Sequence, residues 1–272
     1  MSDGLPPLRD VIRRHEITAR KSMGQNFLLD PNLTDRIARA AGDLTTVNVI
    51  EIGPGPGGLT RALLANGARH LITIERDPRS AEAIRELVSH YPGRLQIIEA
   101  DALEIRLQNL VEPPIKIVAN LPYNIAIPLL LGWLKDLGGI ASLTLMFQRE
   151  VADRLAARPR TKAYGRLSVI AQWLCEVRPT FNLSKDAFTP RPKVTSTVVN
   201  LTPRLKPLAE ARFEAVEAVT AAAFGQRRKM LRASLKPLDI DPVACGIEPT
   251  QRAEELLPED FCALARLLDT KD

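Results

Sequence analysis

The chain has 272 residues, of which 45% are hydrophobic and 25% charged, with 21 Pro and 15 Gly. This composition is typical of a globular protein and excludes a disordered, collagen-like or coiled-coil chain. At about 100–200 residues per domain, the length allows one large domain, with or without a small one. The net charge is +5, from 37 Lys and Arg against 32 Asp and Glu, which favours a polyanionic partner.

The chain carries few residues suited to binding a metal. Its three cysteines, Cys175, Cys245 and Cys262, form no CxxC pair, and it has only three histidines. We therefore expect no metal site. The segment MSDGLPPLRDVIRRHEI lacks the apolar core of a signal peptide, and no stretch approaches the ~20 apolar residues of a membrane span. These features predict a cytoplasmic protein.

Strands and helices alternate from residue 30 to residue 148. Asp30 and Pro31 predict the start of the first helix, because Asp caps helix N-termini and Pro suits the first helical position. Apolar strands that alternate with helices predict a parallel sheet covered on both faces. The expected strands are 47–53, 70–77, 95–101, 115–123 and 142–148, and the expected helices are 33–42, 59–67, 80–90 and 126–139.

The pattern changes after residue 148. Helices are expected at 150–158 and 167–175, and the β-branched run TSTVVNL indicates that the last strands of the sheet form a hairpin. From Pro207 onward the pattern is helical, and Pro203 and Pro207 mark a hinge. We expect two domains, a sheet domain over residues 1–204 and a small all-helical domain over residues 205–272.

Charge is distributed unevenly along the chain. Residues 146–206 hold twelve Lys and Arg against four Asp and Glu, a net charge of +8, whereas residues 239–272 hold three against nine, a net charge of −6. Two basic segments that flank the predicted site favour a shared nucleic-acid surface over a merely solvated one. The candidate nucleic-acid contacts are Arg149, Arg158, Arg160, Lys162, Arg191, Lys193, Arg227, Arg228 and Lys229.

A glycine loop, EIGPGPGG at 51–58, follows a predicted strand and precedes a helix. It fits G-x-G-x-x-G, and Glu75 lies about 20 residues further on, where a carboxylate accepts hydrogen bonds from ribose hydroxyls. This pattern is weak and also fits a dinucleotide-binding domain. The absence of GK[ST] excludes a P-loop.

Three details favour S-adenosylmethionine over a dinucleotide. Pro54 and Pro56 remove N–H donors that a pyrophosphate needs. Gly53 and Gly55 permit the close backbone approach that suffices for a ligand without phosphate. Asp101, at the end of the third strand, is placed to accept a hydrogen bond from an adenine amino group.

The loop Asn120-Leu121-Pro122-Tyr123 follows the fourth strand, at the sheet edge where open α/β sheets bind ligands. It suits methylation of an exocyclic amine. The Asn120 side-chain oxygen and the Leu121 carbonyl can accept hydrogen bonds from the amine and aim its lone pair. Pro122 fixes the direction of that carbonyl, and Tyr123 offers a face on which a flipped base stacks.

Together these motifs resemble the small-subunit (16S) ribosomal RNA adenine N6,N6-dimethyltransferases, the KsgA or RsmA type. KSMGQNFLLD at 21–30 is similar to the family's N-terminal cofactor motif, and QREVADRL, YGRLSV and FTPRPKVTST are similar to its later motifs. The resemblance implies cofactor contacts by Asn26, Leu28, Gly53, Glu75, Asp101 and Asn120. It also implies that Phe188 completes a stacking clamp with Tyr123.

The resemblance implies a Rossmann-like, seven-stranded, S-adenosylmethionine-dependent methyltransferase. Such an enzyme modifies N6 of two adjacent adenosines in the 3′-terminal hairpin of 16S rRNA, within the small subunit or an assembly intermediate. We expect a monomer that needs no metal. Four alternatives stay open: a large-subunit adenine methyltransferase of the macrolide-resistance type, a DNA adenine methyltransferase, a ribosome-assembly factor that only binds, and an NAD-dependent dehydrogenase. The DNA enzyme is disfavoured because the sequence shows no separate DNA-recognition domain.

Overall fold

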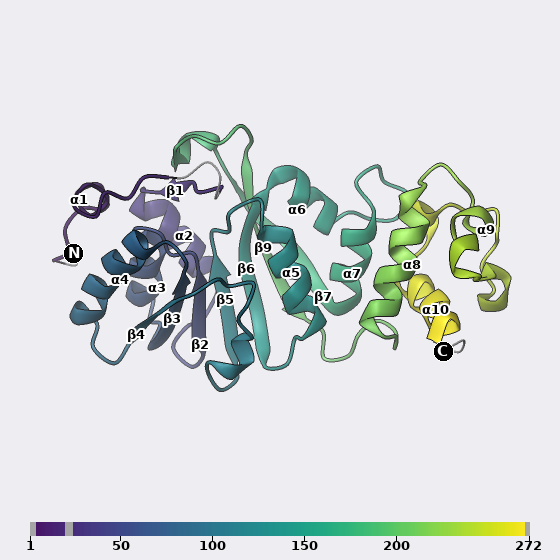
Figure 1. Cartoon of the computed structure of the whole chain (residues 1–272), viewed down its shortest axis with the longest axis horizontal. Helices are drawn as coiled ribbons and strands as arrows, with labels where there is room; N and C mark the ends of the chain where they lie inside the picture. Colours follow the sequence, from purple (N-terminus) through teal and green to yellow (C-terminus); the bar gives the residue numbers. More distant parts are fainter. Residues whose placement is uncertain (1–3, 20–23, 270–272) are drawn as a thin grey trace. The chain divides into compact units, whose positions relative to one another are not determined.

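A computed structural model describes residues 4–19 and 24–269, and its main feature is a seven-stranded sheet in the order β4-β3-β2-β5-β6-β9-β7 (Figure 1). Strands β2 to β6 are parallel, as predicted, and β9 runs antiparallel to β6. The strands are β1 (Phe27–Leu28), β2 (Asn48–Ile52), β3 (His70–Glu75), β4 (Leu95–Glu99), β5 (Ile115–Ala119), β6 (Ile140–Gln148), β7 (Cys175–Leu183), β8 (Phe188–Thr189) and β9 (Ser196–Pro203).

Apart from the helix at 8–14, which was not predicted, the helices lie in segments that the sequence pattern predicts as helical. The Asp30 side chain accepts a hydrogen bond from the Asn32 amide at 2.8 Å, and Pro31 is the first helical residue, which confirms the predicted start. The α-helices are α1 (Leu8–Arg14), α2 (Pro31–Ala40), α3 (Gly58–Ala65), α4 (Pro78–His90), α5 (Ala126–Lys135), α6 (Arg149–Leu155), α7 (Arg166–Leu174), α8 (Phe213–Gly225), α9 (Leu231–Ser234) and α10 (Pro258–Asp269).

The predicted hairpin of the last strands is present in outline. Strands β7 and β9 are neighbours, and β9 takes the inner position beside β6. The segment between them contributes β8, which pairs antiparallel with β1 in a separate two-stranded sheet. This small sheet brings the segment at 24–28 beside the segment at 188–189.

Contacts divide the chain into two compact units. Unit 1 comprises residues 1–149 and 179–201, and unit 2 comprises residues 150–178 and 202–272. Helices α6 and α7 are therefore grouped with the C-terminal helices. A grouping by contacts does not test which parts of the chain fold independently. The predicted division into two domains at residue 204 therefore stays a prediction.

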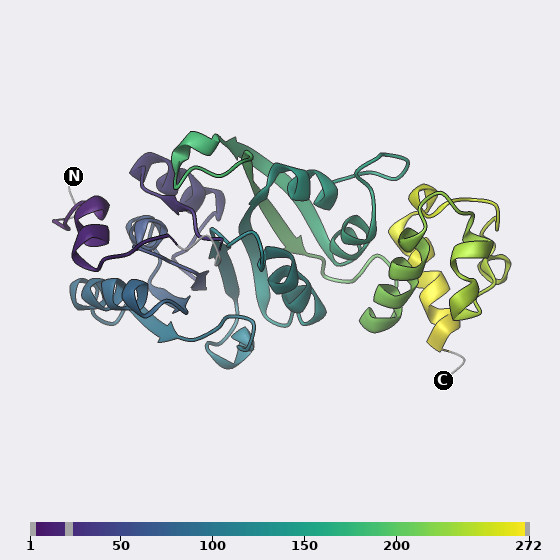
Figure 2. The same ribbon diagram turned by 45° about the horizontal axis from the view of Figure 1, so that its top comes forward.

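Unit 1 is a sheet with helices packed against it. Both views show α4 beside β4, and α1 beside α4 at the same end of the unit (Figures 1 and 2). An ion pair of 3.0 Å joins Arg14 of α1 to Glu86 of α4. The fully buried side chains of the core include Leu63, Ile84 and Val118.

Unit 2 has a core of aromatic rings. The ring centroids of Phe224 and Phe261 lie 5.4 Å apart, and those of Phe224 and Tyr164 lie 6.0 Å apart. Tyr164 is fully buried, and its hydroxyl donates a hydrogen bond to the Leu256 carbonyl at 2.9 Å. Because a buried phenol needs such a partner, this contact fixes the end of the loop at 158–165 against the segment before α10.

Candidate active site

The glycine loop between β2 and α3 adopts a conformation that only glycine tolerates easily. Gly53 and Gly55 have φ angles of +66° and +54°. A Cβ on Gly55 would lie 3.1 Å from the Phe27 ring, and a Cβ on Gly53 would lie 4.0 Å from the Pro122 Cδ atom. Gly53 and Pro122 line the same pocket. The loop therefore keeps open the space between itself and the Asn120–Tyr123 loop, as close backbone approach to a ligand requires.

The Glu75 carboxylate organises this end of the sheet. It accepts hydrogen bonds from the amides of Arg76 and Asp77 through Oε1, both at 2.8 Å, and from the Gly55 amide through Oε2 at 3.1 Å. Burial raises the pKa of Glu75, and the three amides oppose that shift. Oε2 accepts only one of these bonds and keeps a lone pair for a ligand hydroxyl, as the predicted ribose contact requires.

A second acid, Glu51, lies beneath the same loop. Its side chain is 1% exposed, and Oε2 accepts a hydrogen bond from the Thr60 hydroxyl at 2.7 Å. Burial raises the pKa of Glu51 to about 8; the bond from Thr60 opposes the shift and the nearby Glu75 charge adds to it. Glu51 therefore ties β2 to the first turn of α3 as a carboxyl group that is largely protonated at neutral pH.

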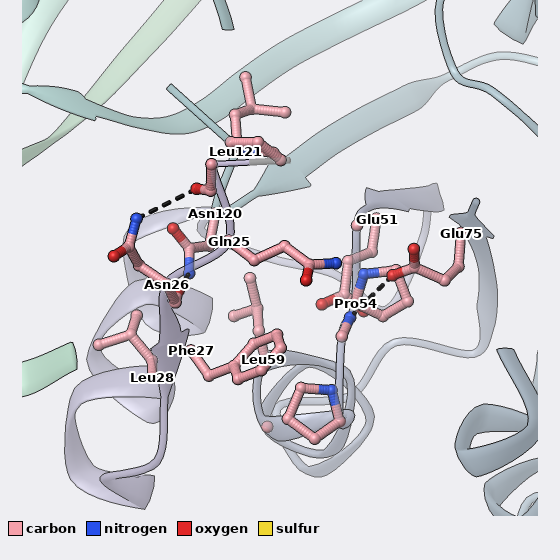
Figure 3. Close-up of a pocket in the computed structure, with 16 residues that line it drawn as sticks. Gln25, Asn26, Phe27, Leu28, Glu51, Pro54, Leu59, Glu75, Asn120 and Leu121 are labelled. Carbon is pink, nitrogen blue, oxygen red and sulfur yellow. Dashed lines mark hydrogen bonds between the residues drawn. The ribbon is translucent and has the colours of Figure 1, made fainter. Parts of the chain in front are cut away.

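Asn120 is oriented by the segment at 24–28. Its Nδ2 donates to the Asn26 carbonyl at 3.0 Å, and the Asn26 side chain donates to the Gly24 carbonyl at 3.1 Å (Figure 3). No group of residues 4–19 or 24–269 donates to the Asn120 Oδ1 atom. The side-chain nitrogen of Asn120 therefore points at the Asn26 carbonyl, and the side-chain oxygen is left as an acceptor at the pocket. The predicted recognition of an exocyclic amine requires this orientation.

The rest of the Asn120–Tyr123 loop is a tight turn into α5. The Pro122 carbonyl accepts hydrogen bonds from the amides of Ile125 and Ala126, both at 3.1 Å. Within the described residues no donor reaches the Leu121 carbonyl, so it remains available to an amine. Tyr123 is half-buried, and its hydroxyl lies 2.5 Å from the Ser196 hydroxyl.

Leu28 and Phe188 are brought together by the pairing of β1 with β8, in which they are directly opposite each other. Phe188 is only 4% exposed and packs in the core of unit 1. The clamp with Tyr123 stays a prediction. Of the N-terminal motif at 21–30, residues 21–23 lie outside the described residues.

Asp101 differs from the other predicted cofactor residues. Its Oδ1 accepts a hydrogen bond from the Leu103 amide at 3.0 Å, and its Oδ2 forms an ion pair of 2.7 Å with Arg76. Arg76 was not among the predicted site residues. It follows Glu75 at the end of β3, and the parallel pairing of β3 with β4 places it beside the end of β4.

The predicted residues that line the pocket are Asn26, Leu28, Gly53, Gly55, Glu75, Asn120, Leu121 and Pro122.

The candidate nucleic-acid contacts fall into two sets, and all of them are exposed. In unit 1 the Arg149 amide donates to the Thr195 carbonyl at 2.9 Å, which places Arg149 beside the start of β9. Arg191 is paired with Asp186 at 2.8 Å. The set in unit 1 is Arg149, Arg191 and Lys193, and the set in unit 2 is Arg158, Arg160, Lys162, Arg227, Arg228 and Lys229.

Across residues 4–19 and 24–269, no helix has both the length and the apolar character needed to cross a membrane. In the same part of the chain, no three His, Cys, Asp or Glu side chains gather into a potential metal site.

The chain matches the family model described as ribosomal RNA adenine dimethylase over residues 16–270. It is 64% identical to the ribosomal RNA small subunit methyltransferase A of Paramagnetospirillum magneticum, over 98% of this chain and 96% of that relative. The fold resembles a dimethyladenosine transferase from Plasmodium falciparum, with a TM-score of 0.74, 25% identity and coverage of 89% of this chain and 97% of that one. It also resembles the 23S rRNA methyltransferase ErmE, with a TM-score of 0.65, 31% identity and coverage of 90% and 100%.

The sheet order and the pocket between the glycine loop and the Asn120–Tyr123 loop are those of a Rossmann-like methyltransferase, the fold class that the sequence predicted. The chain belongs to the ribosomal RNA adenine dimethylase family and is an S-adenosylmethionine-dependent methyltransferase. The dehydrogenase alternative is thereby excluded.

Proposed function

We propose that this protein methylates N6 of two adjacent adenosines in the 3′-terminal hairpin of 16S rRNA, giving N6,N6-dimethyladenosine during small-subunit assembly. The observation that carries the proposal is the orientation of Asn120: its nitrogen donates to the Asn26 carbonyl at 3.0 Å, and no donor among the described residues reaches its oxygen. An acceptor at that point recognises the hydrogens of an exocyclic amine. The small-subunit target is supported by the name of the relative with 64% identity.

The residues around the pocket fit S-adenosylmethionine. The gap kept open by Gly53 and Gly55 admits a ligand close to the backbone, and the free lone pair of Glu75 suits a ribose hydroxyl. When bound, S-adenosylmethionine would supply an electrophilic methyl group and leave as S-adenosyl-L-homocysteine. The cofactor contacts proposed for this chain are Asn26, Leu28, Gly53, Gly55, Glu75, Asp101 and Asn120.

The Asn120–Tyr123 loop activates and aligns the acceptor amine. In the first transfer to an adenosine, Asn120 Oδ1 and the Leu121 carbonyl each accept one amine hydrogen, and in the second transfer one of them accepts the remaining hydrogen. These bonds localise the nitrogen lone pair and direct it at the methyl group. Tyr123 and Phe188 hold the flipped base by stacking. Asn120, Leu121, Pro122 and Tyr123 carry no group that is basic at neutral pH, so the methylated amine releases its proton to water.

The two sets of basic residues are proposed to bind the phosphates of the rRNA. In unit 2 the Arg160 amide donates to the Glu254 carbonyl at 2.6 Å, and Arg227 donates to the Tyr164 carbonyl at 2.9 Å. The loops at 158–165 and 226–229, far apart in the sequence, therefore meet beside Glu254. Their exposed side chains form one basic surface, and Arg149 and Lys193 form another beside the start of β9.

We also propose the remaining features that the sequence predicted. The protein acts in the cytoplasm, as a monomer and without a metal. Its catalytic domain ends near residue 204, since β9 is the last strand among the described residues and ends at Pro203, and the helical domain follows.

The experiment is methyl transfer from labelled S-adenosylmethionine to purified small subunits that lack the modification, followed by mapping of the label on the RNA. We expect label on N6 of two adjacent adenosines in the 3′-terminal hairpin. Large subunits incubated in parallel serve as the control. Label on large-subunit RNA instead would favour the large-subunit alternative. The identity to the 23S rRNA methyltransferase ErmE is 31%. Tight binding to small subunits without transfer would favour the assembly-factor alternative.

A further inference from the structure

We propose that Ser196 is a positioning residue for methyl transfer, because its hydroxyl fixes the far end of the Tyr123 ring on which the acceptor adenine stacks. The inference rests on the proposed function and adds to it a residue from β9, 73 positions further along the chain. The two hydroxyl oxygens lie 2.5 Å apart. Both residues belong to unit 1.

The position of Ser196 is rigid. It is fully buried, and in the antiparallel ladder of β6 and β9 it lies opposite Gln148. The residue before it is anchored as well. The Thr195 carbonyl accepts a hydrogen bond from the Arg149 amide at 2.9 Å. The Ser196 hydroxyl is therefore a fixed point on the sheet.

The near end of the tyrosine is fixed by the turn into α5. Pro122 precedes it, with its own φ restricted by the ring and its carbonyl bonded to two amides at 3.1 Å. A phenol ring held at its backbone and at its hydroxyl cannot swing about χ1. Without the bond to Ser196 the ring has one anchor, and a stacked base loses its alignment with the methyl donor.

The pair of hydroxyls also explains why a serine lies at this buried position. Buried hydroxyls need a partner, and within the described residues the Ser196 side chain has no partner other than Tyr123. Successive side chains in a strand point to opposite faces. Thr197, the next residue, donates to Asn182 and so provides a matched buried hydroxyl whose hydrogen-bond partner lies outside the Asn120–Tyr123 loop.

A double-mutant cycle on the full chain tests this role, with labelled transfer to small subunits as the assay. Ser196→Ala and Tyr123→Phe each remove one hydroxyl and keep the ring, and each should lower kcat/KM about tenfold, chiefly through kcat. The double variant should lose no more than either single variant, since one interaction is removed in all three. Thr197→Val is the control for loss of a buried hydroxyl, and it should stay within about twofold of the unsubstituted protein.

Binding of S-adenosylmethionine, measured by calorimetry, should be unchanged in both single variants. The inference is overturned if Ser196→Ala matches the unsubstituted protein, if the losses in the double variant multiply, or if the loss is confined to KM. Should Ser196→Ala fail to fold, Tyr123→Phe decides alone: a tenfold loss supports the inference and full activity overturns it. If the unsubstituted protein transfers no methyl group to small subunits, the proposed function fails first and this inference fails with it.

Discussion

The pocket of unit 1 and the basic surface of unit 2 differ in how their polar side chains are held. Around the pocket of unit 1 the polar side chains are buried or half-buried and hydrogen-bonded within the protein, as with Glu75, which accepts three amide hydrogen bonds. The basic residues of unit 2 are exposed, and some have acidic partners, as Arg227 has in Glu254 at 3.2 Å. The difference teaches that the pocket depends on exact geometry, whereas the basic surface depends on summed charge. Substitutions should therefore have large, site-specific effects in unit 1 and small, salt-dependent effects in unit 2.

The largest effect is expected from Asn120→Ala. The substitution removes the acceptor oxygen that aligns the amine, and preorganised groups of this kind are worth about 10²–10³ in kcat. We expect kcat for small subunits to fall by that factor while circular dichroism and the melting temperature stay close to those of the unsubstituted protein. Methylation at an undiminished rate would contradict the mechanism.

Buried Glu51 makes the unfolding free energy depend on pH. Because its pKa is raised to about 8 in the folded protein from an ordinary value of 4.5, the folded state holds a proton that the unfolded state releases between these pH values. Stability therefore falls as pH rises from 4.5 to 8 and levels off above 8.

Glu51→Gln removes this dependence and keeps an acceptor for the Thr60 hydroxyl. In urea denaturation the variant should be as stable as the unsubstituted protein at pH 5 and more stable at pH 9, by a difference on the order of 2–4 kcal/mol. Equal stability of the two proteins at pH 9 would show that Glu51 ionises normally.

Gly55→Ala tests the geometry of the glycine loop. The φ angle of +54° strains any side chain, and the new Cβ would lie 3.1 Å from the Phe27 ring. We expect a loss of about 1–3 kcal/mol in unfolding free energy and weaker S-adenosylmethionine binding by calorimetry. Gly132→Ala is the matched control. A Cβ there meets nothing within 4 Å, and alanine favours a helix by about 1 kcal/mol, so this variant should be neutral or stabilised.

Much of unit 1 could be predicted because its signals are local. Asp30 and Pro31 mark a helix start, and the glycine loop and the Asn120–Tyr123 loop lie at the ends of parallel strands, where their positions follow from the fold. The residues that were missed act across the sheet. The bond between Tyr123 and Ser196 depends on the register of β6 and β9, which no local pattern encodes.

The same reason explains two further omissions. Strands β1 and β8 have two residues each, too few for any periodicity, so the pairing of Leu28 with Phe188 could not be derived from the residues. The ion pair of Arg76 with Asp101 forms between two strand ends. A parallel pairing of β3 with β4 predicts that proximity, but only once the strand order is known.

The smallest effect is expected from Arg228→Ala in unit 2. Arg228 is exposed in the loop between α8 and α9 and has no ion-pair partner among the described residues. Loss of one phosphate contact should weaken binding to small subunits by about three- to tenfold at low salt and reduce the slope of log K against log salt by about one. Binding is measured by filter retention over a range of salt concentrations.

Arg39→Ala is the control, because it removes the same charge from α2 of unit 1. Arg39 is paired with Asp35 at 2.8 Å, and its loss should leave the slope unchanged. An equal loss in both variants would mean that only the net charge acts and that Arg228 touches no phosphate.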